Sequence, residues 1–409
     1  MRFIVDFHIH SKYSRATSPQ MDIKTLSEYA KLKGIHLLGS GDFTHYLWLQ
    51  ELKQYLKDSG DGLYEYNGVK FILTGEISNI YSKNGKVRKI HNIIFAPGFD
   101  IVDKINSTLS AYGNLSADGR PIIGMDAKDL VEILFGISRD IFIVPAHIWT
   151  PHFSLFGSNS GFDSIEECFE EYAKDIYALE TGLSSDPGMN WRWSKLDRFA
   201  LISNSDSHSP QKIGREANIF DTEMSYNSII DTLKKKDPKR FLYTIEFFPE
   251  EGKYHYDGHR VCNIRFEPKL TRAHKNICPV CGRPLTVGVM NRVEQLADRE
   301  DGFTKEGFIP YKRMIPLSEI IADVYNVADG SKKVESEYSA IVPRIGTEFE
   351  VLIELEEDEL LKKIPLKIAR AIINVRKEKV KILPGYDGEY GKIEIPKEES
   401  DSDRQLDLF

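Results

Sequence analysis

The sequence contains few cysteines and no long apolar run. Its 409 residues include four cysteines, too few for the disulfide framework of a small secreted protein. No apolar stretch approaches the roughly 18 residues of a transmembrane helix. The opening segment reaches Asp6 and His8 too soon to be a signal peptide. We therefore expect a cytoplasmic protein that makes no contact with a membrane.

An excess of positive charge is also absent. With 54 Lys and Arg against 62 Asp and Glu, the formal charge is −8, which excludes a polycation that holds nucleic acid non-specifically but not a local basic surface. The sequence shows no internal repeat, heptad or apolar stripe, so we expect a monomer. At roughly 150 residues per domain, the length predicts two or three domains.

Seven short apolar runs, rich in β-branched and aromatic residues, recur in the first 208 residues. Stretches with helical spacing, such as 23–33 and 47–57, separate them, which indicates parallel strands in repeated βα units. Asp126 and Ser164 are candidate helix caps. The pattern predicts an α/β fold, a closed or nearly closed β/α barrel with its active site at the carboxyl ends of the strands. The runs are 3–7, 37–41, 71–75, 92–96, 141–146, 176–179 and 200–205.

The pattern changes after residue 240. Residues 241–248 have the composition of a strand, a segment rich in His and Cys follows to about residue 292, and the sequence is helical from Leu317 onward. Residues 396–404 are too polar to pack. We therefore predict a barrel over 1–240, a small module over 241–300, a helical, basic region over 301–395 and a disordered tail over 396–409.

Imidazoles and carboxylates lie at the ends of the predicted strands. Alternate residues of a strand point to one side, so His8 and His10 can hold one metal together. A single histidine at a strand end is more often a hydrogen-bonded structural residue, but several imidazoles and carboxylates in one crevice are costly without a cation. Together they predict a multinuclear centre that activates water without a serine or cysteine nucleophile. The predicted metal ligands are His8, His10, Glu76, His91, His147, Asp206 and His208.

These strand-end residues resemble the polymerase-and-histidinol-phosphatase (PHP) family. The resemblance rests on Asp6-Phe7-His8-Ile9-His10-Ser11, Glu76, His147 and Asp206-Ser207-His208. It implies a distorted seven-stranded barrel with a trinuclear centre for phosphoester hydrolysis. By position, it implies that His8, His10, Glu76 and Asp206 hold one ion, that Glu76, His91 and His147 hold a second, and that His208 joins the third.

Two positions depart from the family pattern. Arg15 replaces an acidic residue or histidine, and Asp42 is followed by Phe43 instead of a histidine, with His45 further on. The third ion is then either missing or held by Asp42 or His45. Arg15 is a candidate phosphate clamp. Asp42, His45 and Arg15 are therefore the candidate catalytic residues beside the metal ligands.

A second metal motif lies in the middle of the chain. His259-x-x-Cys262 and, fifteen residues later, Cys278-Pro279-Val280-Cys281 form a four-ligand pattern for structural zinc. His255 and His274 are alternatives to His259 as the fourth ligand. A redox dithiol would require a βαβ context, which is absent here.

Two segments are candidate nucleic-acid contacts. Residues 362–381 include eight Lys or Arg and a single acidic residue, Glu378. This excess of positive charge indicates either a surface that follows a phosphate backbone or a solvated helix face. The loop 182–193 offers polar and aromatic side chains for a nucleobase, although core packing of its two tryptophans is the alternative. The candidate DNA-binding residues are Ser184, Asn190, Trp191, Arg192, Lys367, Arg370 and Lys377.

The chain ends in Gln405-Leu406-Asp407-Leu408-Phe409. This segment resembles the peptide by which bacterial replication and repair proteins bind the sliding clamp. The resemblance implies that Leu408 and Phe409 fill an apolar pocket while Gln405 makes polar contacts. It also implies a bacterial protein that works at the nucleoid.

Over almost the whole chain, the combination resembles the endonuclease Q family of DNA repair nucleases. The supporting segments are 41–45, 145–151, 179–182 and 384–388. The resemblance implies cleavage 5′ to a deaminated base (hypoxanthine, uracil or xanthine) or an abasic site, with zinc and with Mg²⁺ or Mn²⁺ as cofactors. The altered base would be flipped into a pocket between the loop 182–193 and the carboxyl-terminal module. The alternatives are a small-molecule phosphatase with the same metals and a non-catalytic zinc scaffold tethered to the clamp.

Overall fold

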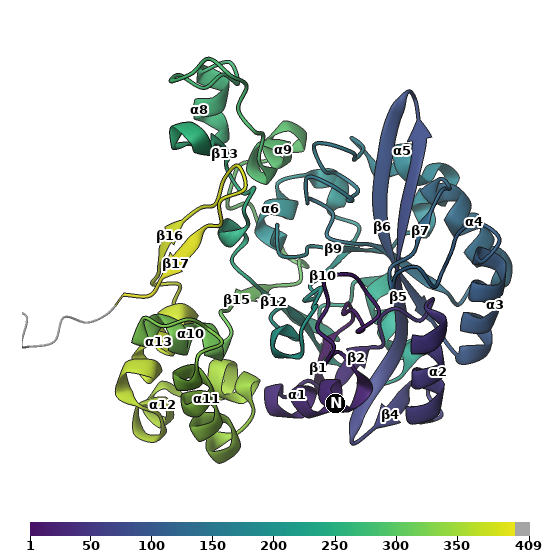
Figure 1. The fold of residues 1–409 in the computed structure, drawn as a ribbon, viewed down its shortest axis with the longest axis horizontal. Coiled ribbons are helices and arrows are strands. Elements are labelled where there is room, and N and C mark those ends of the chain that lie inside the picture. Colours follow the sequence, from purple (N-terminus) through teal and green to yellow (C-terminus); the bar gives the residue numbers. More distant parts are fainter. Residues whose placement is uncertain (397–409) are drawn as a thin grey trace, which may run out of the picture.

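The computed structural model describes residues 1–396, so the clamp peptide Gln405–Phe409 lies outside the described residues. The chain forms a large barrel, a small module that we call the knob (residues 257–296) and a helical module (residues 317–376). The last two lie one above the other along one side of the barrel (Figure 1). Within the described part of the chain, no helix is long and apolar enough to cross a membrane.

The predicted seven-stranded barrel is confirmed. Strands β1, β2 and β5 are parallel neighbours, β6 joins β5 to β8, and β9 contacts β8 and pairs with β10. A bridge between Ile9 and Ser207 returns the chain after β10 to the end of β1, which closes the ring. The strands are β1 (Arg2–Asp6), β2 (Leu37–Gly39), β5 (Val69–Lys83), β6 (Lys86–Ala96), β8 (Phe142–Pro145), β9 (Ala178–Glu180) and β10 (Ala200–Ile202).

The prediction of parallel strands throughout is wrong for β5 and β6, which form one long antiparallel hairpin. Asn84 and Gly85 connect them with φ angles of 53° and 73°, the left-handed pair of a type I′ turn. The hairpin extends well beyond the predicted runs 71–75 and 92–96, and its tip projects past the barrel rim (Figure 1). The short strands β3 (Lys57–Asp58), β4 (Tyr64–Tyr66) and β7 (Ile122–Ile123) add to its edges.

Amphipathic helices cover the outside of the barrel, and their caps follow the sequence signals. The side chain of Asp22 accepts from Thr25 N–H at the start of α1, and Asp126 and Ser164 cap α4 and α5 as predicted. Helix α1 has the predicted bounds, whereas α2 ends two residues earlier than expected. The helices are α1 (Ile23–Lys33), α2 (Tyr46–Tyr55), α3 (Phe99–Leu109), α4 (Ala127–Ile137), α5 (Ile165–Phe169), α6 (Pro187–Trp191) and α7 (Tyr226–Lys235).

The barrel sheet continues past residue 240, where we predicted the boundary of the barrel. Strand β12 (Phe241–Glu246) pairs with β11 (Ala217–Asp221), which pairs with β1. On its other side β12 pairs with β15 (Tyr311–Arg313). The knob is therefore inserted between two neighbouring strands of the same sheet, and both ends of the insertion are anchored in the barrel.

The knob and the helical module complete the described chain. The knob contains β13 (Asp257–His259), β14 (Ile264–Phe266), α8 (Pro268–Ala273) and α9 (Val289–Leu296), and the hairpin β16 (Lys381–Leu383) and β17 (Lys392–Glu394) leans against it. The helical module contains α10 (Leu317–Tyr325), α11 (Lys332–Ile345), α12 (Glu357–Lys363) and α13 (Leu366–Arg376). Lys33 of α1 ties this module to the barrel through a buried ion pair with Glu348, at 3.0 Å from Nζ to Oε2.

Candidate metal centre

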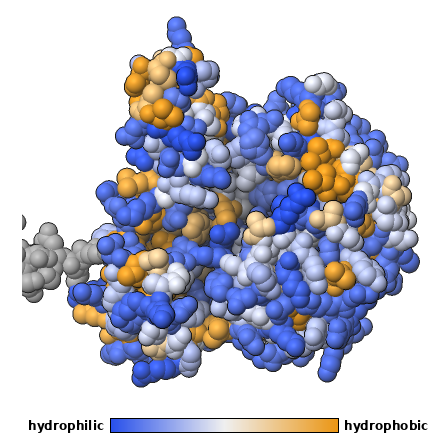
Figure 2. All heavy atoms as spheres, in the orientation of Figure 1, coloured by the Kyte–Doolittle hydropathy of each residue, from blue (hydrophilic) through white to orange (hydrophobic). Residues whose placement is uncertain are grey.

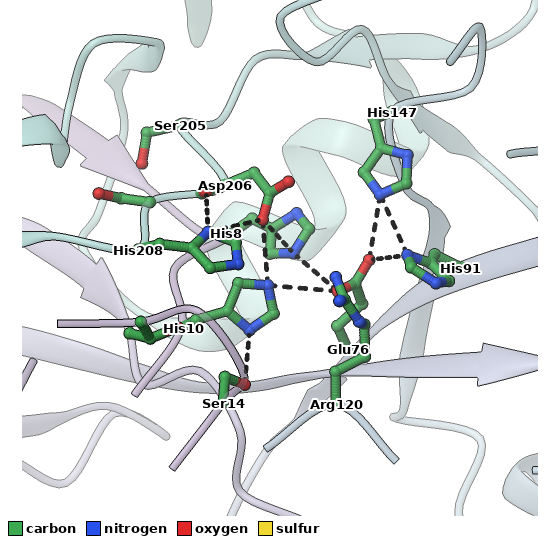
Figure 3. A network of polar contacts seen from close by, with 12 residues as sticks. His8, His10, Ser14, Glu76, His91, Arg120, His147, Ser205, Asp206 and His208 are labelled. Atoms are coloured by element: carbon green, nitrogen blue, oxygen red, sulfur yellow. Dashed lines mark hydrogen bonds and ion pairs between the residues drawn. The ribbon is translucent and has the colours of Figure 1, made fainter. Parts of the chain in front are cut away.

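The mouth of the barrel brings the seven predicted metal ligands together (Figure 3). They fall into three groups, and within each group the ligand atoms lie within 4.8 Å of one another. Glu76 belongs to two groups and His10 to two, so the groups form one continuous centre. The groups are His8, His10 and Glu76; Glu76, His91 and His147; and His10, Asp206 and His208.

Glu76 stands between two pairs of histidines, and its side chain is fully buried. Its Oε1 lies 2.7 Å from His91 Nδ1 and 3.1 Å from His147 Nε2. Its Oε2 lies 3.3 Å from His10 Nε2 and 3.5 Å from His8 Nε2. Each carboxylate oxygen thus faces a different pair of imidazoles, which is the geometry of a carboxylate that bridges two cations.

Three atoms of the centre are buried without a hydrogen-bond partner: His8 Nε2, His10 Nε2 and Asp206 Oδ1. Asp206 Oδ1 nevertheless lies 3.0 Å from His10 Nε2 and 3.7 Å from His8 Nε2. Buried polar atoms are almost always satisfied, so converging unsatisfied ones require an explanation. A divalent cation between these nitrogen and oxygen donors satisfies all three, and the residues fit such an ion.

The electrostatics of the centre also call for positive charge. Burial disfavours the charged form of His8, but the carboxylates of Glu180, Glu76 and Asp206 outweigh it and raise the His8 pKa well above its usual value. Burial alone would likewise raise the pKa of Glu76, but His91, Arg120 and His8 hold it well below the usual range. Burial lowers the pKa of His91 to about 4, so this imidazole is neutral, the form that binds metals.

A second ring of carboxylates orients the two histidines that follow β1. Asp42 Oδ1 lies 2.9 Å from His10 Nδ1, and Glu180 Oε1 lies 3.0 Å from His8 Nδ1. The hydroxyl of Ser14 donates to Asp42 Oδ2 at 2.9 Å. Because each Nδ1 faces a carboxylate, each Nε2 is directed at the centre as the ligand atom.

Of the three predicted catalytic residues, Asp42 lies beside a predicted metal ligand, whereas His45 and Arg15 have other partners. Asp42 contacts His10 as described above and is absent from the donor groups found among residues 1–396. His45 precedes α2 and stacks on Tyr13, with ring centroids 4.5 Å apart. The side chain of Arg15 is 78% exposed and pairs with Asp118. The guanidinium in the centre belongs instead to Arg120, whose Nη1 lies 3.2 Å from Glu76 Oε2.

Sequence reasoning missed Glu180 and Arg120. Glu180 is the last residue of the buried strand β9, so the strand-end rule that found the metal ligands would also have found it. Arg120 lies in the irregular segment between α3 and β7, where no periodicity marks a position. Only the folded chain brings it to Glu76.

The backbone bends sharply at three of the strand ends. Asp42, His147 and Asp206 have positive φ angles of 48°, 31° and 46°, a conformation that costs energy for residues with a side chain and gathers at functional sites. Gly182 makes room for one of these turns, because a Cβ there would lie 2.5 Å from His147 Cβ. The turns direct side chains into the mouth of the barrel.

The second motif also gathers its ligands. His259, Cys262, Cys278 and Cys281 form one group with ligand atoms within 4.8 Å of one another. His259 is the histidine of this group, whereas His274 stacks on Phe266 and His255 is buried beside a pocket. A closed set of three thiols and one imidazole fits a tetrahedral structural metal.

The predicted DNA contacts of the loop 182–193 are largely packing residues. Asn190 is fully buried and accepts from Trp149 Nε1 at 2.7 Å. Arg192 is 7% exposed and pairs with Glu294, and Trp191 stacks on Phe308 at 4.9 Å. Both side chains are buried and have partners within the protein, and their assignment to DNA contact stays a prediction.

Ser184 and the basic residues of the helical module remain accessible. Ser184 lines a pocket of about 400 Å³ between the barrel and the knob. Lys367 and Arg370 are exposed on α13, and Lys377 is exposed and pairs with Glu357 at 2.7 Å. The guanidinium of Arg376 instead donates to three carbonyls, those of Val351, Leu352 and Leu355.

The orienting role of Asp42 leads to a testable prediction. Asp42→Asn should weaken Mn²⁺ binding by about 10- to 100-fold, the usual cost of losing a residue that orients a ligand. Isothermal titration of the purified variants with Mn²⁺ measures this. Glu51→Asn, which removes a carboxylate paired with Lys12, is the control and should bind like the wild type. Equal affinities in all three proteins would refute the role of Asp42.

Residues 316–379 match the family model described as the MJ0043 C-terminal domain. Two relatives extend the comparison. The protein MJ0043 of Methanocaldococcus jannaschii is 35% identical over 253 residues, which cover 60% of this chain but 31% of that protein. The protein YqxK of Bacillus subtilis is 29% identical over 415 residues, which cover 96% of this chain and 99% of that protein.

Two solved structures match the whole fold. The crystal structure of the lesion-specific endonuclease PfuEndoQ from Pyrococcus furiosus has a TM-score of 0.87 and 32% identity, and the match covers 99% of both chains. The crystal structure of endonuclease Q with a 27-mer duplex substrate, carrying an abasic lesion at the active site, has a TM-score of 0.86 and 32% identity over 98% of this chain and 100% of that chain. The chain therefore belongs to the endonuclease Q family.

Proposed function

We propose that this protein is a metal-dependent DNA repair endonuclease that hydrolyses the phosphodiester 5′ to a deaminated base or an abasic site. The observation that carries the proposal is the match to a lesion-specific endonuclease over 99% of both chains, which includes the barrel, the knob and the helical module. The cluster of metal donors at the barrel mouth supplies the chemistry that phosphodiester hydrolysis needs.

We propose the ligand sets that the family resemblance implies. His8, His10, Glu76 and Asp206 would hold one cation, and Glu76, His91 and His147 would hold a second. His208 would complete a third set with His10 and Asp206. Divalent cations such as Mg²⁺, Mn²⁺ or Zn²⁺ supply Lewis acidity that activates water and neutralises the phosphate.

The protein's own side chains prepare this centre before substrate arrives. Asp42 and Glu180 fix the ring orientations of His10 and His8, so the ligand atoms need little rearrangement. Glu76 is excluded from solvent, while Asp206 and His208 are 28% and 32% exposed at the mouth. A phosphodiester therefore approaches from the side of Asp206 and His208.

We propose that the altered base is flipped into the pocket between the barrel and the knob, where Figure 2 shows a notch in the surface. Leu183, Tyr254, His255 and Tyr390 are among its lining residues, and aromatic and apolar walls suit a planar base. Thr150 connects the pocket to the metal centre, because it lines the pocket and its Oγ1 lies 3.1 Å from His147 Nδ1.

The three predicted regions of the chain have separate roles in this proposal. Residues 1–240 form most of the catalytic barrel and 241–300 most of the zinc-binding module. Residues 301–395 carry the exposed Lys367, Arg370 and Lys377, which we assign to the DNA backbone. We propose a monomer that works in the cytoplasm, at the nucleoid.

Strand cleavage tests the proposed function directly. A labelled duplex with one deoxyinosine, deoxyuridine or abasic site should be nicked once, 5′ to the lesion, in the presence of Mn²⁺ or Mg²⁺. Asp206→Ala should lose more than about 100-fold of this activity, since it removes a ligand rather than an orienting group. Asp221→Ala is the matched control, because Asp221 lies opposite Arg2 in the register of β1 and β11, at the other end of β1 from the centre.

The other outcomes separate the alternatives. Turnover of a small phosphate monoester without any nick would replace the endonuclease with a phosphatase. Inactivity on both substrates, with clamp binding retained, would leave the non-catalytic scaffold.

We propose that the knob holds one structural zinc ion, and metal analysis tests this. The purified protein should contain zinc that Cys281→Ser loses, because structural zinc supplies folding energy to a small module. Cys168→Ala is the control, since Cys168 is buried in the barrel away from the ligand group. Zinc content that is unchanged in Cys281→Ser would contradict the assignment.

We propose that Gln405, Leu406, Leu408 and Phe409, which lie outside the described residues, bind a bacterial sliding clamp. Replacing Leu408 and Phe409 by alanine should abolish binding in surface plasmon resonance with an immobilised clamp, because the two side chains supply the apolar contact. Asp407→Ala is the control and should bind. A wild-type protein that does not bind the clamp would refute the proposal.

A further inference from the structure

One guanidinium lies in the metal centre without a role in the mechanism described so far. Arg120 Nη1 lies 3.2 Å from Glu76 Oε2, and its side chain is 27% exposed whereas that of Glu76 is fully buried. Figure 3 shows the guanidinium beside the Glu76 carboxylate, with His10 and Ser14 to one side and His91 to the other. Arg120 is therefore placed between the buried bridging carboxylate and the solvent.

The backbone on both sides of Arg120 is tightly held. The carboxylate of Asp118 accepts from Arg120 N–H at 3.2 Å. The N–H of Gly119 donates to the Tyr13 carbonyl at 3.1 Å, and that of Ser78 donates to the Pro121 carbonyl at 3.0 Å.

Gly119 allows this segment to pack closely against Asp42 and Ser14, which orient His10. A Cβ on Gly119 would lie 2.2 Å from Asp42 Oδ2 and 2.3 Å from Ser14 Oγ, so a larger residue does not fit. The guanidinium is thus positioned by the same residues that orient His10. Such preorganisation is typical of groups that act in a reaction and not only in folding.

A role confined to neutralising Glu76 leaves most of this side chain unused. A guanidinium has five N–H donors in a rigid fork. Among residues 1–396, the guanidinium of Arg120 donates one hydrogen bond, to Glu76. The remaining donors suit phosphate oxygens, which guanidinium groups bind with two parallel hydrogen bonds. Four imidazoles already surround Glu76, so its negative charge has other partners.

We propose that Arg120 binds a non-bridging oxygen of the scissile phosphate and stabilises the charge that develops there during hydrolysis. The inference rests on the proposed phosphodiesterase function. It assigns to Arg120 the clamp role that the sequence pattern gave to Arg15, which lies at the surface against Asp118.

The test compares full-length Arg120→Ala, Arg120→Lys and Arg139→Ala with the wild type. Hydrolysis of bis(p-nitrophenyl) phosphate and of the lesion duplex is measured with Mn²⁺. Arg120→Ala should lose about 100-fold or more in kcat/KM on both substrates, the usual cost of one aimed donor in an active site. Arg120→Lys should recover part of this loss, because lysine keeps the charge but not the fork. Arg139→Ala, at a 69% exposed side chain that lies 4.0 Å from Asp175, is the control and should retain wild-type activity.

A second measurement separates phosphate binding from a structural role. Isothermal titration gives the affinity of each variant for Mn²⁺ and, in the Mn²⁺-loaded protein, for inorganic phosphate. Arg120→Ala should keep the Mn²⁺ affinity and lose phosphate affinity. Unchanged phosphate affinity, or a loss of Mn²⁺ affinity that accounts for the loss of activity, would overturn the proposal.

The two proposals fail in different ways. A wild type that hydrolyses bis(p-nitrophenyl) phosphate but leaves the lesion duplex intact would contradict the repair function, and the small substrate would still test Arg120. If the wild type hydrolyses neither substrate, the phosphate titration decides the role of Arg120 alone.

Discussion

The metal centre depends on one buried carboxylate, that of Glu76. Its two oxygens face different pairs of histidines, at 2.7 to 3.5 Å, and burying such a charge is costly unless it is paired. Four imidazoles and the guanidinium of Arg120 surround it. Without cations these groups must share protons, whereas bound cations would take the imidazoles as ligands and Glu76 as a shared ligand. The other residues of the site are arranged around this carboxylate.

The barrel supplies the rigidity that this arrangement needs. Glu76 and His91 lie on the long hairpin of β5 and β6, whereas His8, His10, His147 and Asp206 follow strand ends. Left-handed turns at Asp42, His147 and Asp206 redirect the chain at the rim, and their strain is tolerated because the packed strands beneath determine the geometry. The knob and the helical module attach through β12, β15 and the buried pair Lys33–Glu348, so both are fixed to the sheet that carries the metal centre.

The sequence predicted the barrel and the seven histidines and carboxylates that gather at its mouth because both follow from short-range patterns. Apolar runs marked the strands, and donors just after a strand share one edge of the sheet. The same rule would have reached Glu180. It failed for the β5–β6 hairpin, because apolar runs do not reveal strand direction, although Asn84-Gly85 was a usable turn signal.

Other differences from expectation came from tertiary contacts that no local pattern contains. Asn190 and Arg192 have the composition of a nucleobase-binding loop, yet Trp149 and Glu294 bind their side chains in the interior. Arg15 lies near the first motif in sequence but points to Asp118, whereas Arg120 reaches Glu76 from a distant loop. Burial and long-range pairing decided each case.

The most direct test of this account is the position of the cations relative to Glu76. Crystals grown with Mn²⁺ and measured near the manganese absorption edge give an anomalous map of the centre. Manganese should appear at both oxygens of Glu76, one peak with His8 and His10 and another with His91 and His147, and a third peak should appear among His10, Asp206 and His208. A single peak bound through one oxygen of Glu76, or manganese bound elsewhere, would contradict this account.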